Sequence, residues 1–217
     1  MNRIPKRFTV AAMALAASCA HADVLVSNLA QPERAFSELT SLFWAAQSFT
    51  TDGSVHSLSS IDAMLGTSAF RGDDTEYVAE LHATGPGIIG SLLTTFSFGS
   101  MPSGAPTSIS LLPTSGVSLA AGTTYWLVMG ERHGSLDSEY LGWSYAEGNA
   151  SIGPGTLGAF GYSTDGGMSW SASTFDTPNP FRLAVNVASP VPEPSSMAGI
   201  ALGLLALLAM RRVHRTE

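Results

Sequence analysis

The chain has 217 residues, with 17 acidic and 10 basic side chains and a formal net charge of −7 at pH 7. The segment from Asp23 to Pro190 is more acidic still, because it has four arginines against fifteen Asp and Glu residues, a formal charge of −11. An acidic surface repels phosphate groups, so this composition excludes nucleic acid as a partner and disfavours contact with anionic lipid headgroups.

The chain begins with the pattern of a secretory signal peptide. The basic residues before its short apolar run are Arg3, Lys6 and Arg7. The sequence Ala20-His21-Ala22 then has the A-x-A spacing of a signal peptidase site. We therefore expect residues 1–22 to form a signal helix that is removed by cleavage after Ala22.

Cleavage after Ala22 would also remove Cys19, the only cysteine of the chain. The mature protein would then have no disulfide, no thiolate metal site and no cysteine nucleophile. A second interpretation is lipoprotein processing at Cys19, but residues 16–18 lack the leucine that usually precedes such a site.

The body, residues 23–190, is one domain long and alternates apolar and polar residues with a period of two. Residues 125–129 and 181–187 show this alternation most clearly, and each is expected to form a strand with one buried face. The other expected strands are residues 24–28, 46–50, 58–65, 76–83, 91–98, 107–112 and 141–145. Only residues 31–44 suggest a short helix, beginning near Pro32.

About nine or ten short strands, separated by clusters of Gly and Pro, predict an all-β fold. The expected arrangement is an antiparallel β-sandwich, jelly-roll-like, with the N-terminal signal helix before it and a C-terminal hydrophobic helix after it.

Three carboxylates lie close together in one predicted loop of the body, at Asp73, Asp74 and Glu76. Oxygen ligands of this kind suit Ca²⁺, but the spacing is not that of an EF-hand, so a solvated acidic loop is the favoured interpretation. The body histidines show no metal-binding spacing. We expect no resident metal, no cofactor and no enzymatic activity.

Three stretches of the body carry a resemblance to a known family. They are AQSFT at residues 46–50, LAAGTTYWLV at residues 119–128 and STDGG at residues 163–167. Together they resemble the choice-of-anchor domains, type R, of bacterial surface proteins. These motifs are largely fold signatures, and the resemblance implies no catalytic activity. Locally they predict a turn at residues 120–122 and a strand on which Tyr125 and Trp126 occupy opposite faces.

Residues 163–170, Ser-Thr-Asp-Gly-Gly-Met-Ser-Trp, also fit the S-x-D-x-G-x-S/T-W pattern of the Asp-box. We expect a tight hairpin in which Asp165 accepts hydrogen bonds from nearby amides, glycine adopts positive φ and Trp170 packs under the turn. Sialidases repeat this box and add an arginine cluster, whereas this body has one box and four scattered arginines. The interpretation is therefore structural.

The chain closes with an uncharged run from Met197 to Met210 that is followed by basic residues. As a helix these fourteen residues would span roughly 21 Å, which is short for a hydrocarbon core of about 30 Å. The basic end consists of Arg211, Arg212 and Arg215, and it marks the cytoplasmic side. We therefore expect a temporary membrane anchor.

Just before this run stands Val191-Pro192-Glu193-Pro194. The motif, the apolar run and the basic end together resemble the PEP-CTERM sorting signal of Gram-negative bacteria. The resemblance implies recognition by a membrane-embedded exosortase, with Glu193 as a recognition contact. It also implies transient residence in the inner membrane and association with exopolysaccharide and biofilm systems.

From these features we expect a secreted, exosortase-sorted protein of the envelope, cell surface or extracellular matrix with a structural or exopolysaccharide-associated role. The alternative is a carbohydrate-binding or carbohydrate-active module in which exposed aromatic side chains stack on sugar rings. The candidates for that stacking are Trp143, Tyr145 and Trp170.

Overall fold

The structure, a computed structural model, describes residues 22–67, 76–98, 104–132, 141–172 and 179–188. All of them belong to one compact unit, Ala22–Ser189. The expected signal helix and the expected C-terminal helix lie outside the described residues. Within those ranges no helix is long and apolar enough to cross a membrane.

The described residues form β-strands throughout. The strands are β1 (Ala22–Ser27), β2 (Glu33–Leu39), β3 (Trp44–Thr50), β4 (His56–Thr67), β5 (Glu76–Gly85), β6 (Ile88–Phe98), β7 (Thr107–Pro113), β8 (Ser118–Leu119), β9 (Thr124–Arg132), β10 (Leu141–Ala146), β11 (Thr156–Ser163), β12 (Ser171–Ala172) and β13 (Leu183–Ala188).

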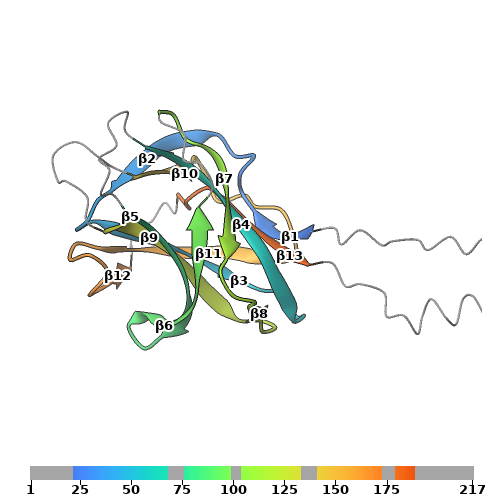
Figure 1. The fold of residues 1–217 in the computed structure, drawn as a ribbon. Helices are drawn as coiled ribbons and strands as arrows, with labels where there is room; N and C mark the ends of the chain where they lie inside the picture. The colour runs from blue at the N-terminus through green and yellow to red at the C-terminus, as the bar shows by residue number, and fades with distance from the viewer. Residues whose placement is uncertain (1–21, 68–75, 99–103, 133–140, 173–178, 189–217) are drawn as a thin grey trace, which may run out of the picture. The chain divides into compact units, whose positions relative to one another are not determined.

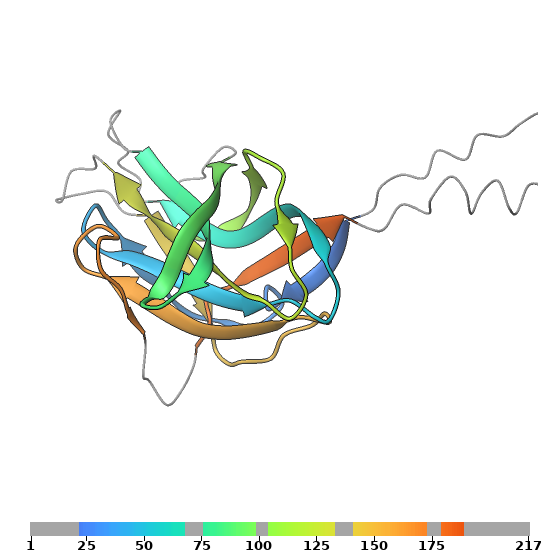
Figure 2. The same cartoon turned by 90° about the horizontal axis from the view of Figure 1, so that it is seen from below.

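These strands pair into one antiparallel sheet that curls strongly into a half-barrel (Figures 1 and 2). The strand order is β1-β13-β4-β7-β6-β5-β9-β3-β11-β12, with β10 pairing β2 and β4, and β8 pairing β4. The all-β antiparallel class is confirmed, but a jelly-roll of two separate sheets is not what forms. The physical reason is β6, which pairs with β5 along most of its length and with β7 through Phe96–Phe98, so the ladder continues from one wall to the other.

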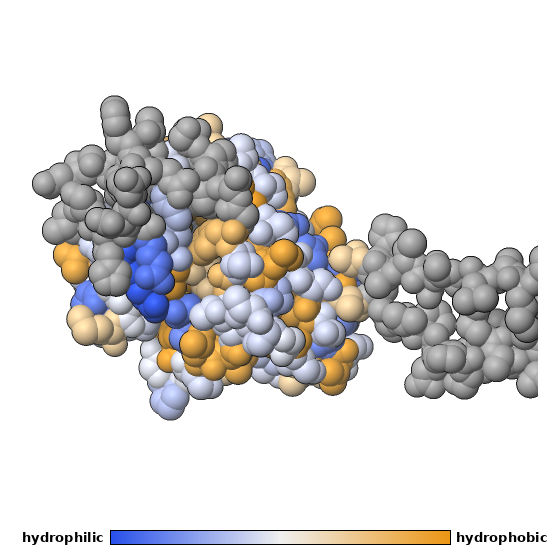
Figure 3. Space-filling view, in the orientation of Figure 1, coloured by the Kyte–Doolittle hydropathy of each residue, from blue (hydrophilic) through white to orange (hydrophobic). Residues whose placement is uncertain are grey.

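The core lies inside the curl. One wall contributes inward side chains from β3, β5 and β9, and the facing wall contributes them from β1, β4, β7, β10 and β13. The largest fully buried side chains are Trp143, Phe49, Leu25, Leu39, Ile61, Leu65, Leu81, Leu111, Leu119, Leu127, Met129 and Leu141. On the surface, Figure 3 shows apolar residues in several separate patches among polar ones.

Strand β9 is buried on both faces, which differs from the expectation of a single buried face. Tyr125 and Trp126 do occupy opposite sides, as predicted: Tyr125 belongs to the inner core and Trp126 to a second cluster outside the sheet. We call this second group the outer tryptophan cluster. Its members are Trp44, Ala46, Val78, Trp126 and Val128, with Ile88, Ile89 and Trp170 packed against them.

The short helix expected at residues 31–44 is wrong, because this segment contains β2. Strand β2 pairs with β10 from Glu33 to Leu39, and its burial alternates with a period of two. Ala35, Ser37 and Leu39 point toward the interior while Phe36 points outward. Strand β2 has only three apolar residues, two on its inner face and one on its outer face, which is too few to reveal its period from sequence.

Candidate functional site

A pair of buried amides, Asn28 and Gln47, holds the segment that enters β13. We call this pair the amide clamp. The backbone N–H of Phe181 donates to Gln47 Oε1 at 3.0 Å, and Asn28 Nδ2 donates to the Phe181 carbonyl at 3.1 Å. The N–H of Leu183 donates to Asn28 Oδ1 at 2.8 Å. Both amides are almost fully buried, and their hydrogen bonds fix the position of the backbone at the entry to β13.

Gln47 also compensates for an irregularity in β11. The pairing of β11 with β3 shifts register between Leu157 and Phe160, which takes the carbonyls of Gly158 and Ala159 out of the ladder. Gln47 Nε2 donates to the Gly158 carbonyl at 2.8 Å, and Ser48 Oγ donates to the Ala159 carbonyl at 2.7 Å. The AQSF stretch therefore has a structural role, because it connects β3 to β11. The feature of the sequence that could have indicated this role is a glutamine within a largely apolar strand.

On the outer face of the sheet, Arg182 forms a second polar group with Glu33 and Ser144. Arg182 Nη2 donates to the Leu29 carbonyl at 2.7 Å and Nη1 lies 3.4 Å from Glu33 Oε2. Ser144 Oγ donates to the same Glu33 oxygen at 2.9 Å. These contacts join the chain after β1 to β2, β10 and the residue before β13.

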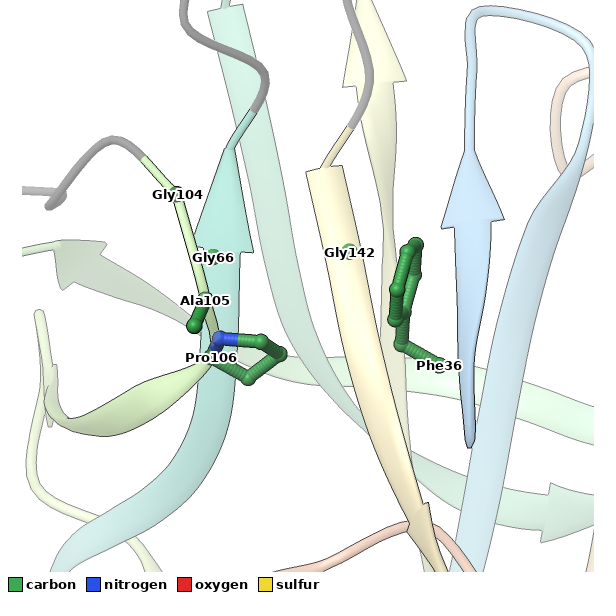
Figure 4. A pocket seen from close by; sticks show the side chains of 6 residues that line it. All are labelled: Phe36, Gly66, Gly104, Ala105, Pro106 and Gly142. Atoms are coloured by element: carbon green, nitrogen blue, oxygen red, sulfur yellow. The ribbon is translucent and has the colours of Figure 1, made fainter. Parts of the chain in front are cut away.

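Beside this group lies a small hollow of about 150 Å³ (Figure 4). Its lining residues are Phe36, Gly66, Gly104, Ala105, Pro106 and Gly142. In Figure 4 the Phe36 ring lies beside the β10 backbone at Gly142, and Pro106 lies against β4 near Gly66. A Cβ on Gly66 would clash with the carbonyl oxygen of Gly104, so this glycine allows the close approach of residues 104–106.

Phe36 is the aromatic side chain that reaches solvent here, with 42% of its surface exposed. It lies directly opposite Ser144 in the β2–β10 ladder, so the two side chains share one face of the sheet. An exposed aromatic ring at the edge of a hollow, on the same face as the Ser144 hydroxyl, is chemistry that a sugar-binding surface uses. Sequence reasoning missed Phe36 because it assigned the segment to a helix.

A second, more apolar groove of about 250 Å³ lies between β2 and the strands β3 and β11. Its lining residues are Ser37, Phe43, Ala45, Phe160, Gly161, Tyr162 and Phe181. The rings of Phe43 and Tyr162 are stacked with centroids 6.3 Å apart. The lining offers few polar groups that could orient a ligand.

The three aromatic residues proposed from sequence as sugar platforms are placed differently. Trp143 has no exposed surface and stacks on Phe181 at 4.3 Å, so its assignment as a platform is wrong. It faces inward because β10 pairs with both β2 and β4 and is covered by the core. Tyr145 is partly buried edge-on to Phe181, and Trp170 is partly buried against the outer tryptophan cluster.

The hairpin at residues 163–170 has the predicted Asp-box geometry. Asp165 Oδ1 accepts from the Ser163 hydroxyl at 2.6 Å and from the Ser169 N–H at 2.8 Å. Gly166 and Gly167 adopt φ values of 69° and 85°. The hydroxyls of Ser163 and Ser169, together with the Ser169 amide, lower the pKa of Asp165 to about 2. All of these bonds close the turn on itself, which agrees with the structural interpretation.

A charged network on the outer face of β5 and β9 links Glu80, His82 and Arg132. Arg132 Nη2 donates to Glu80 Oε1 at 2.9 Å, and His82 Nε2 lies 3.0 Å from Glu80 Oε2. His82 Nδ1 lies 3.0 Å from the Gly90 carbonyl, so both ring nitrogens face acceptors. The hydrogen bond with His82 lowers the pKa of Glu80. Burial opposes the charged form of His82, but the bonds to Glu80 and Gly90 outweigh it and raise its pKa.

The structure describes only some of the other residues that were predicted from sequence as a calcium site or a signal cleavage site. Asp73 and Asp74 lie outside the described residues, while Glu76 is an exposed residue at the start of β5. In the described part of the chain no three His, Cys, Asp or Glu side chains gather as a metal site would require. Ala22 is the first residue of β1 and pairs with Ala188, whereas Ala20 lies outside the described ranges.

Residues 190–213 match the family model of the PEP-CTERM protein-sorting motif. This match includes the predicted motif Val191–Pro194, and it implies an exported protein that is processed by exosortase and located at the cell surface or envelope. No curated protein matches the chain. The match covers the tail alone, so the likeness of the body to choice-of-anchor domains stays a prediction.

Proposed function

We propose that this exported protein is a structural, non-enzymatic component of the envelope or extracellular matrix that associates with the exopolysaccharide of its own cell. The observation that carries the proposal is that buried polar side chains of the body form hydrogen bonds with backbone groups. Asn28, Gln47 and Ser48 spend their hydrogen bonds on the backbone of β11 and the entry to β13. Side chains committed in this way rigidify a fold and leave no free group for catalysis at those positions.

The charge of the body supports the choice of partner. With four arginines and fifteen acidic residues between Asp23 and Pro190, the body repels strongly anionic polymers. A neutral or weakly charged polysaccharide avoids this repulsion. The resemblance to choice-of-anchor domains of bacterial surface proteins supports the same placement.

The test is retention of the tail-processed protein on exopolysaccharide purified from the same cell. We expect retention that changes little between low and high salt, because the contact does not depend on opposite charges. An equally acidic globular protein serves as the control. No retention above that control contradicts an association with exopolysaccharide.

A second candidate is a carbohydrate-binding or carbohydrate-active module, and the exposed Phe36 beside its hollow is the observation that favours it. In this case Phe36→Ala should lower glycan retention about tenfold, since stacking of this kind is worth roughly 1 to 2 kcal/mol. Met168→Ala, at an exposed position of the hairpin between β11 and β12, is the matched control. Equal retention of both variants favours the purely structural role.

A further inference from the structure

The body ends very close to the motif that the processing enzyme recognises. Strand β13 pairs with β1 up to Ala188, whose partner is Ala22, and with β4 up to Val187. The sorting motif begins at residue 190, and Pro192 is four residues beyond Ala188. A fully extended chain of four residues spans at most about 14 Å. While the β1–β13 pair is intact, Pro192 therefore cannot lie farther than this from the end of the sheet.

That reach is small compared with the folded body. A compact domain of this length has a radius of gyration of about 15 Å. An enzyme that holds Pro192 in its active site must consequently approach the body within less than one body radius. Because of this limit, the enzyme must contact the end of the sheet that carries Ala188.

The end of the sheet from which the chain leaves β13 has a definite composition. Because Val187 pairs with Leu58 while β4 continues back to His56, the start of β4 extends past the end of β13. We call this surface the exit face, and its exposed residues are Ala22, Asp23, Val24, Val55, Ser57 and Ala188. Val24 and Val55 are 40% and 68% exposed. In Figures 1 and 2, the start of β1 and the end of β13 lie side by side.

The charges of the exit face are acidic or neutral. Asp23 is exposed, and Asp52 is hydrogen-bonded to His56 at 2.6 Å just before β4. The described arginines belong to other parts of the body, namely β2, the end of β9 and the residue before β13. A surface without lysine or arginine is poorly suited to anionic lipid headgroups, which attract basic residues.

We propose that the exit face is a docking surface for the membrane-embedded enzyme that processes the tail, which meets it with an apolar patch next to neutral or basic side chains. The short reach brings the two surfaces together, and the exposed valines and Asp23 supply the complementary chemistry. The enzyme then recognises a folded body as well as the motif.

The test compares the rate of tail removal in pulse-chase experiments on the full chain in a host that has the processing enzyme. Val24→Arg and Val55→Arg should each slow removal about tenfold, because an added charge in an apolar contact is left unpaired. Met168→Arg is the matched control. Its hairpin is anchored beside Trp44, at the opposite end of β3 from the loop that holds Val55, and 83% of its surface is exposed.

Each arginine variant is also made with about eight glycine and serine residues inserted after Ser189, which add roughly 27 Å of reach. The insert should bring the processing rate of both variants to within about twofold of that of the wild-type chain with the same insert, because contact is no longer forced. Recovery also shows that the arginine variants fold.

Wild-type rates at the native spacing would overturn the proposal, and so would a defect that the insert leaves unchanged. Altered binding to vesicles of the host's inner-membrane lipids, with the same sensitivity to Val55→Arg, would instead assign the exit face to lipid. Because the assay reads tail removal, it is independent of exopolysaccharide retention.

Discussion

The amide clamp and the charged network on β5 and β9 both tie strands together, but they do so with different chemistry. Asn28 and Gln47 are neutral, almost fully buried and bonded to backbone groups. Glu80, His82 and Arg132 are ionisable, and Arg132 exposes nearly half of its side chain. The first group connects segments more than one hundred residues apart, whereas the second joins two neighbouring strands.

The hydrogen bonds that hold distant strands together are therefore a separate set of interactions from the ionisable groups on the outer face. Neutral buried hydrogen bonds do not change with pH or salt over the physiological range, and they are costly to break because their partners remain buried. Ion pairs near the surface change with both conditions and contribute less. Because the amide clamp contains no titratable group, its contribution to stability should not change with the pH outside the cell.

The largest effect is expected for Gln47→Leu. This change leaves the buried N–H of Phe181 without its partner and removes the partly buried hydrogen bond to the Gly158 carbonyl. At roughly 1 to 3 kcal/mol for the buried N–H and about 1 kcal/mol for the partly buried bond, the free energy of unfolding should fall by about 2 to 4 kcal/mol. Urea unfolding at pH 5, 7 and 8 should show the same loss at each pH.

Thr95→Ala, which removes an exposed hydroxyl pair with Thr114, is the control for Gln47→Leu and should change stability by less than about 0.5 kcal/mol. A loss at Gln47 that varies strongly with pH would contradict the distinction between the two networks.

Asn28→Ala should cost about 2 to 3 kcal/mol, because the Phe181 carbonyl and the Leu183 N–H lose their partner. Since Gln47 binds the N–H of Phe181 and Asn28 binds its carbonyl, the effects of the two substitutions should not be additive. A double-mutant cycle should give a coupling of about 0.5 kcal/mol or more. Strict additivity would mean that the two amides act as independent bonds rather than as one clamp.

His82→Gln should reveal the pH dependence of the charged network. The folded pKa of His82 lies above its ordinary value of 6.5, so its stabilisation is fully present below pH 6.5 and is lost as pH rises through the folded pKa. The folded pKa of Glu80 lies below 4.5, so its stabilisation is present above pH 4.5 and is lost as pH falls through the folded pKa.

The stability difference between wild type and His82→Gln should therefore be greatest between pH 4.5 and 6.5, at about 1 kcal/mol, and should shrink by pH 9. Denaturant unfolding across this range at low salt measures this difference in stability. A difference that is constant with pH would refute an ionic role for His82.

The smallest effect is expected for Asp165→Asn, which tests a charged group that lies in solvent. The pKa of Asp165 is about 2, below its ordinary value of 3.8, so the turn is stabilised above pH 3.8 and loses this support as pH falls toward 2. The substitution should loosen the hairpin without changing the overall melting midpoint measurably. Fluorescence of Trp170, titrated from pH 5 to 2, should show a local transition in the wild type that the variant lacks.

Much of the strand layout follows from local pattern. The period-two alternation at residues 181–187 placed β13 correctly, and the spacing of Ser163, Asp165, Gly167 and Trp170 predicted the hairpin. Strands β2, β8, β11 and β12 were not predicted, since each has too few apolar residues or too many glycines to show a period.

The exposed site could be predicted less well than the strands. Burial of Trp143 and exposure of Phe36 depend on which strand covers β10 and which face of β2 turns outward. A one-residue change in register would exchange these faces, and no local pattern in β2 or β10 settles that register.

The class of the body and the identity of the tail follow from the sequence, because alternation of side chains, turn chemistry and the matched motif at residues 190–213 are all local properties. Contacts in the folded chain are needed to explain why the strands form one curled sheet, why both faces of β9 are buried and how Gln47 joins β3, β11 and the entry to β13. These features depend on contacts between different strands, which for Gln47 and its partners lie more than one hundred positions apart. Such contacts are fixed by packing and by the need to satisfy buried polar groups, which no short stretch of chain encodes.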